Sequence, residues 1–136
     1  MTSRGGALAL AISSVTLIGA THGVQAVDIN GVWASDAAQC KNIFVKSSNA
    51  VSFSKDADLH GSGFIVEGNQ LRGKMGACTV KARKDEDPVV NIVAVCSTDI
   101  AISTVQFRFR MIDPNRVLRE FPGMPDLQMG YERCSM

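Results

Sequence analysis

The sequence predicts an all-β domain, either a small antiparallel up-and-down barrel or a strongly curled sheet of about eight to ten short strands. Beyond the first 26 residues, nearly every apolar segment is short, rich in β-branched or aromatic side chains, and bounded by Gly, Asn, Asp or Pro. Residues 102–112 alternate apolar and polar side chains, which is typical of a strand with one buried and one wet face. The connections are short, and closure into a barrel removes exposed edges. A flattened sandwich is the alternative.

The first 26 residues are predicted to be a secretory signal peptide, cleaved before Val27. Arg4 provides a short basic start, residues 7–20 form an apolar run, and Val24 and Ala26 supply the small side chains that the peptidase requires. The apolar run is too short to cross a bilayer comfortably, although a buried N-terminal helix is an alternative. We therefore predict a protein of the bacterial periplasm or the extracellular space, without a membrane anchor.

Residues 27–136 are expected to form a single domain with no net charge. Of the 14 Lys and Arg residues only Arg4 precedes the cleavage site, so the remaining basic side chains balance the 13 Asp and Glu residues. A neutral domain gives no argument for nucleic acid as a partner. We expect a monomer or a weak dimer.

The strands of the first half are short and are bounded by turn residues. They are expected at residues 30–34, 43–46, 51–54, 64–67 and 70–74. Ser35 or Asp36 can cap one helical turn before Cys40, and residues 55–63 have no apolar period and are expected to form a loop.

A long hairpin at residues 76–97, with its turn near Asp87, is the predicted structural centre. Its arms carry Cys78 and Cys96 at equal distances from the turn, so the two cysteines face each other across an antiparallel pair. They share one parity with Val80 and Ile92, which places them on the core face. Further strands are expected at residues 102–112, 117–121 and 127–134.

The four cysteines are predicted to form two disulfides, because an even count in a small exported domain is typical of a disulfide framework. Three connectivities are possible. We prefer Cys78–Cys96 with Cys40–Cys134, since the hairpin predicts the first pair and the second then joins the two ends of the domain. A zinc site is the alternative, but the spacing includes no C-x-x-C pair.

Gly31-Val32-Trp33, on the first strand of the predicted meander, resembles the G-x-W signature of lipocalin-like (calycin) barrels. The resemblance implies that Trp33 closes one end of the barrel and packs against an arginine from near the last strand. Arg133 is the first candidate for this arginine, and Arg119 is the second candidate. The size, the exported precursor and the early cysteine also resemble the bacterial periplasmic inhibitor of secreted metalloproteases, and uncharacterised small secreted bacterial proteins.

Catalysis and cofactors are not expected. Asp56, Asp58 and His60 carry the ligand types of a metal site at alternate positions, but a solvated loop is the simpler interpretation. No histidine other than His60 follows the cleavage site, and no nucleophile elbow is present, so a serine triad has no support. A glycosidase-type carboxylate pair is a spatial arrangement that the sequence does not reveal.

A basic surface is the most suggestive polar feature. If the strands that carry them are neighbours, six side chains would form a strip for an anionic ligand, a polysaccharide or an acidic protein, although the polar outer face of an antiparallel sheet is the simpler interpretation. They are Lys81, Arg83, Arg108, Arg110, Arg116 and Arg119.

The sequence thus predicts an exported, non-catalytic binding module whose partner is an unknown small apolar ligand or a protein. The alternatives are an inhibitor of secreted proteases or other hydrolases, and a structural envelope protein. An apolar cavity would favour the ligand-binding module, whereas a filled core with a protruding loop would favour the inhibitor.

Overall fold

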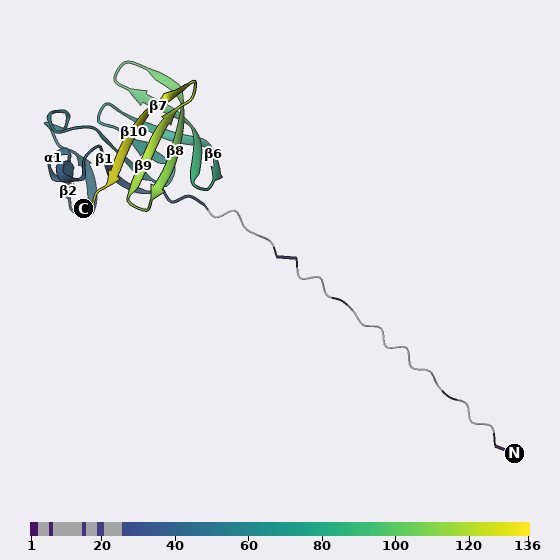
Figure 1. Cartoon of the computed structure of the whole chain (residues 1–136). Helices are drawn as coiled ribbons and strands as arrows, with labels where there is room; N and C mark the ends of the chain where they lie inside the picture. Colours follow the sequence, from purple (N-terminus) through teal and green to yellow (C-terminus); the bar gives the residue numbers. More distant parts are fainter. Residues whose placement is uncertain (3–5, 7–14, 16–18, 21–25) are drawn as a thin grey trace.

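The computed structural model describes residues 1–2, 6, 15, 19–20 and 26–136. Eight antiparallel strands close into a barrel in the order β1-β10-β9-β8-β7-β6-β5-β4 (Figure 1). The all-β prediction is confirmed, and the sheet is closed and not a flattened sandwich. The barrel strands are β1 (Gly31–Ala34), β4 (Gly63–Glu67), β5 (Gln70–Arg72), β6 (Gly76–Glu86), β7 (Val89–Thr98), β8 (Ile102–Asp113), β9 (Arg116–Phe121) and β10 (Met124–Arg133).

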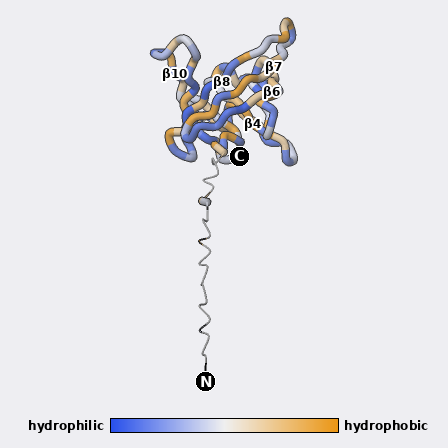
Figure 2. Tube along the Cα trace, turned by 90° about the vertical axis from the view of Figure 1, so that its right-hand side faces the viewer, coloured by the Kyte–Doolittle hydropathy of each residue, from blue (hydrophilic) through white to orange (hydrophobic). Residues whose placement is uncertain are grey.

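The barrel interior is filled by one face of each strand. Apolar and polar residues alternate along much of β8, whereas β7 is apolar along most of its length and alternates between buried and partly buried residues (Figure 2). Trp33, Val90 and Phe109 are almost completely buried, and Phe64 stacks on Phe109 with ring centroids 5.2 Å apart. The inward face of the strands therefore forms the main core.

A second core covers the outer face of β1. The separate hairpin of β2 (Phe44–Ser47) and β3 (Ala50–Phe53) packs there with η1 (Ala37–Gln39), α1 (Cys40–Ile43) and η2 (Ala57–Leu59). Figure 1 shows α1 and β2 beside the barrel, next to the C-terminus. Asp36 caps the first turn by accepting a hydrogen bond from the Ala38 amide at 2.8 Å, as one predicted alternative had it. Because both faces of β1 are covered, this strand is buried throughout most of its length.

Both predicted disulfides are present. Cys78 and Cys96 are direct register partners in the β6–β7 hairpin, with Cα atoms 3.9 Å apart, and they pack against the main core. Cys40–Cys134 joins α1 to the end of the chain in the second core. In a framework of this size the two bridges close a short and a long loop, and both restrict the unfolded chain.

Two local predictions are wrong, each because a strand pair contains an irregularity. A β-bulge between Val80 and Ala82 shifts the alternation of β6, so Arg83 lies opposite the inward-facing Ile92 and not on the wet face. The last strand begins at Met124, not Leu127, and its register with β9 shifts between Met124 and Gln128.

The predicted signal peptide lies almost entirely outside the described residues. Of residues 1–26, the structure describes only 1–2, 6, 15, 19–20 and 26. Among the described residues there is no helix with the length and apolar character needed to cross a bilayer.

Candidate functional site

One end of the barrel is closed by the segment that precedes β1. Within this segment Val27 and Ile29 are buried and belong to the main core. The indole Nε1 of Trp33 donates a hydrogen bond to the Ile29 carbonyl at 3.0 Å. The segment therefore lies across the barrel end and is held by both its side chains and its backbone.

Arg133 completes this closure. Its guanidinium lies 4.2 Å from the centre of the Trp33 ring and donates to the carbonyls of Asn30 and Pro114. A Cβ at Gly31, where φ is +133°, would come within 2.5 Å of Arg133 Nη1, so only glycine fits between the arginine and the tryptophan. Arg133, and not Arg119, is thus the arginine that stacks on Trp33.

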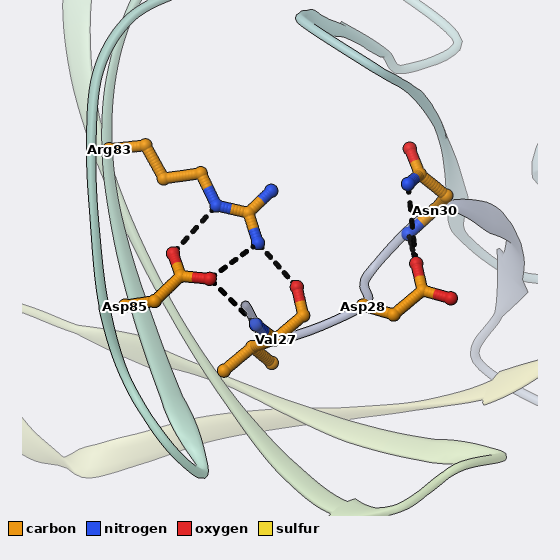
Figure 3. Close-up of polar contacts among 5 residues, drawn as sticks. All are labelled: Val27, Asp28, Asn30, Arg83 and Asp85. Atoms are coloured by element: carbon orange, nitrogen blue, oxygen red, sulfur yellow. Dashed lines mark hydrogen bonds and ion pairs between the residues drawn. The ribbon is translucent and has the colours of Figure 1, made fainter. Parts of the chain in front are cut away.

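Arg83 and Asp85 bind the backbone of Val27 at the same end (Figure 3). The Val27 amide donates to Asp85 Oδ2 at 2.6 Å, and the Arg83 guanidinium donates to the Val27 carbonyl. Arg83 also holds both carboxylate oxygens of Asp85, at 2.7 and 2.9 Å. The hydrogen bond from Arg83 is the main reason that the pKa of Asp85 lies below its ordinary value; burial acts against it, and the Val27 amide adds to the lowering.

The opposite end of the barrel holds the candidate ligand site. A cavity of about 120 Å³ lies beneath a more open depression of about 390 Å³, and both include Arg119 and Tyr131 in their walls. The cavity is lined mainly by aromatic and apolar side chains. It is bounded by Gly63, Phe64, Leu71, Arg72, Gly73, Cys78, Phe107, Phe109, Arg119 and Tyr131.

Arg119 is one of two charged side chains in the wall of this cavity, and it lies beside two aromatic rings, of which Phe107 lines the cavity. Its guanidinium lies 4.9 Å from the centre of the Phe107 ring and 4.7 Å from that of Phe121. It is the register partner of the buried Phe109, so it points into the barrel. Arg119 makes no ion pair or side-chain hydrogen bond with any residue that the structure describes. A half-buried cation in aromatic surroundings can accept an anionic group.

The predicted basic strip is not brought together on one face. Arg83 and Arg119 point to the closed and the open end of the barrel, and Arg116 pairs with Asp113 at the β8–β9 turn. Lys81 is exposed at the β6 bulge. Only Arg108 and Arg110 are neighbours on the outer surface, where both share one carboxylate.

That carboxylate is Glu120 on β9, 2.7 Å from Arg108 Nε and 2.6 Å from Arg110 Nε. The hydrogen bond from Arg110 is the main cause that lowers the pKa of Glu120, and Arg108 adds to it against the opposing effect of burial. This cluster neutralises part of the positive charge on which the predicted anion surface depends.

Glu120→Gln is expected to lower the free energy of unfolding by about 1 kcal/mol at neutral pH, because two guanidiniums lose their shared carboxylate. A carboxyl whose pKa is lowered by folding stabilises the protein above its unfolded pKa, and the contribution is lost as the pH falls through the folded value. Urea unfolding at pH 7 and pH 3 should therefore show a smaller difference between the two proteins at the lower pH. An equal difference at both values would contradict the assignment.

The predicted metal ligands do not converge. Asp58 in η2 lies 3.7 Å from the ammonium of Lys74, and His60 ends the same turn. In residues 26–136 and the few described before them, no group of three or more His, Cys, Asp or Glu side chains is close enough to hold a metal ion. Asp56 and its neighbours thus form an ordinary surface turn.

No family model, curated protein or solved structure matches this chain. The site therefore stands on its own geometry. Sequence reasoning singled out Arg83 and Arg119 but missed their inward direction, and it also missed the burial of Val27. The apolar residues Val27 and Ile29, alternating with Asp28 and Asn30 just before the G-x-W tripeptide, were the available signal.

Proposed function

We propose that the protein is an exported, non-catalytic β-barrel that binds a small apolar ligand with one anionic group. The observation that carries this proposal is the position of Arg119 in an aromatic cavity at the open end of the barrel. The apolar part of the ligand would occupy the cavity and the depression above it. The anionic group would contact the guanidinium.

Two physical arguments support this ligand class. Apolar surface gains about 25 cal/mol for each Å² removed from water, so Phe64, Phe107 and Phe109 favour a hydrocarbon or aromatic ligand. A guanidinium binds a carboxylate through two parallel hydrogen bonds, and this contact is stronger where water is excluded. The depression of about 390 Å³ falls within the range of small-molecule sites, roughly 300–1,000 Å³.

The same proposal includes a lipocalin-like relationship and export. The closed eight-stranded barrel, Trp33 near its closed end and Arg133 on the Trp33 ring support the relationship. Two disulfides fit an exported protein, because they form and persist in oxidising compartments. The apolar run at residues 7–20 and the small residues before Val27 support a cleaved signal peptide.

A displacement experiment tests the ligand class. The exported protein is titrated with the fluorescent apolar anion 1-anilinonaphthalene-8-sulfonate, which is then displaced by decanoate or by decanol. We expect decanoate to compete at least tenfold better than decanol, since only the carboxylate gains the contact with Arg119. Equal competition by the two compounds, or failure of both to bind, would contradict the proposal.

Arg119→Gln is expected to weaken decanoate binding about tenfold and to leave decanol binding nearly unchanged, because the uncharged amide keeps much of the volume but loses the charge. Arg110→Gln is the matched control, since Arg110 lies on the outer surface and pairs with Glu120. The Arg110 variant should bind both compounds as the unmodified protein does. Isothermal titration at two salt concentrations measures both variants. If the two variants behave alike, Arg119 is not the anion site.

A partner protein is the second candidate, favoured by apolar side chains at the loops around the open end. Ile100 and Ile102 are 95% and 78% exposed at the β7–β8 connection, and Met75 is 72% exposed between β5 and β6. An inhibitor of a secreted hydrolase would present such residues to its target. Inhibition of a secreted metalloprotease, together with no binding of decanoate, would favour this candidate over the ligand-binding module.

A further inference from the structure

We propose that cleavage before Val27 creates a structural ion pair, in which the new α-ammonium of Val27 binds the carboxylate of Asp85 at the closed end of the barrel. This inference rests on the proposed export and processing, but not on the ligand. It assigns Arg83 and Asp85 a role as the receptor of the mature N-terminus.

The position of the Val27 nitrogen is the first argument. It lies 2.6 Å from Asp85 Oδ2, and the Asp85 side chain is only 12% exposed (Figure 3). Val27 itself is 6% exposed and belongs to the main core, and Arg83 binds its carbonyl. The residue is therefore anchored by its side chain and carbonyl, independently of what precedes it in the chain. After cleavage the nitrogen would remain beside the same carboxylate.

The second argument is the surface position of Ala26, the residue before Val27. Ala26 is exposed, and with Val27 it borders a surface depression of about 400 Å³. The Ala26–Val27 bond thus lies between an exposed and a buried residue. Within residues 26–136, burial begins at the residue that the peptidase motif predicts as the mature N-terminus.

The charges that face the nitrogen favour an ammonium. Asp85 contacts it from β6 through Oδ2, and Arg83 Nη2 binds the same oxygen and the Val27 carbonyl, so the charge of Arg83 opposes that of Asp85 at this position. Around the adjoining depression, Asp28 lies on the same segment, Asp87 in the β6–β7 turn, Asp113 at the end of β8 and Arg133 on β10. Because Asp113 is paired with Arg116, the three other carboxylates stand against the guanidiniums of Arg83 and Arg133, and their excess stabilises a positive charge at this position. A peptide N–H brings one proton and no charge, whereas an ammonium brings three protons and a full charge.

The ion pair would make the processed chain more stable than the precursor. In the precursor, Asp85 accepts from a neutral amide at this position; after cleavage the same carboxylate pairs with a cation. The bond in the precursor is already charge-assisted through its acceptor, and cleavage adds the attraction between two opposite charges. Removal of the signal peptide would thereby complete the closure of the barrel end.

The pH dependence of the stability follows from the direction in which folding shifts the pKa of each group. Pairing raises the pKa of the ammonium above the ordinary value for an α-amino group, about 7.7–8.0. Its stabilising contribution is fully present below that unfolded value and is lost as the pH rises through the folded value. Folding lowers the pKa of Asp85, so the stabilising contribution of this carboxylate is lost as the pH falls through its folded pKa. The mature protein should therefore show a loss of stability above about pH 8 that depends on Asp85.

The test uses the protein purified after export of the full chain. Mass spectrometry first establishes whether it begins at Val27; another first residue would overturn the inference, and decanoate binding would still decide the proposed function separately. Competitive acylation with acetic anhydride then measures the reactivity of the Val27 amine between pH 6 and pH 10. We expect about tenfold slower acylation at pH 6 in the folded protein than in urea, which corresponds to one pKa unit.

Asp85→Asn should restore rapid acylation, whereas Asp113→Asn should not. Asp113 is the matched control because it is a carboxylate of the same barrel end that pairs with the exposed Arg116. If the Asp85 variant fails to fold, the unmodified protein is compared with its Nα-acetylated form in urea unfolding. Acetylation should remove the loss of stability above pH 8. Equal acylation in folded and unfolded protein, or equal pH profiles of free and acetylated forms, would overturn the inference.

Discussion

Trp33→Ala is expected to lower the free energy of unfolding by about 3–5 kcal/mol, a large part of the stability of a domain of this size. The Trp33 side chain is fully buried, stacks on Phe64 with ring centroids 6.2 Å apart, and donates its Nε1 proton to the Ile29 carbonyl. Alanine would leave a cavity under Arg133 and an acceptor without its donor. The closing segment at residues 27–30 should loosen together with the core.

Urea unfolding followed by circular dichroism measures this effect, since the substitution removes the only tryptophan. Trp33→Phe is the matched control, because it keeps an aromatic ring for Phe64 and Arg133 but removes the indole donor. We expect a loss smaller than that of the alanine variant. A small effect of Trp33→Ala, below about 1 kcal/mol, would mean that the ring is not the central support of the closed end.

Alternation and turn residues were sufficient to predict most of the barrel. The cysteines of the β6–β7 hairpin were predictable because equal arm lengths place Cys78 and Cys96 in register, and one bulge between Val80 and Ala82 does not disturb the pair that precedes it. The same bulge misplaced Arg83, which follows it. A period of two fixes side-chain direction only up to the first irregularity of the strand.

The open-end site was not predictable for a similar reason. Arg119 points inward because it pairs with Phe109 across the β8–β9 hairpin, and the register of that hairpin shifts between Met111 and Asp113. In the sequence Arg119 is one of several basic residues near a turn. The sequence also could not show that the charge of Arg108 and Arg110 is partly neutralised, since the carboxylate that pairs with both lies on another strand.

The hairpin of β2 and β3 shows a further limit of pattern reasoning. Its turn residues predicted two strands correctly, but nothing in its composition distinguishes a strand inside the barrel from one packed against the outside. The apolar outer face of β1, Val32 and Ala34, is the only indication that this strand has a cover on its second side. Tertiary packing, and not local preference, decides where such a hairpin lies.

The long disulfide is expected to carry more stability than the short one. Replacing Cys40 and Cys134 together by serine should lower the free energy of unfolding by about 4–5 kcal/mol, while the equivalent change at Cys78 and Cys96 should cost about 3 kcal/mol. The reason is loop length: the first pair is separated by 94 residues and the second by 18, and a longer closed loop restricts the unfolded chain more. Double substitutions avoid a free thiol in either protein.

Urea unfolding of the two double variants, both exported and oxidised, provides the comparison, and each variant serves as the control of the other. The Cys40–Cys134 variant should also release the outer cover of β1, because Cys40 belongs to α1 and both cysteines pack in the second core. Hydrogen exchange should then show lost protection in β2 and β3 while β6 and β7 remain protected. If the variant without Cys78 and Cys96 proves less stable than the variant without Cys40 and Cys134, the packing of the Cys78–Cys96 disulfide against the main core outweighs loop entropy in this barrel.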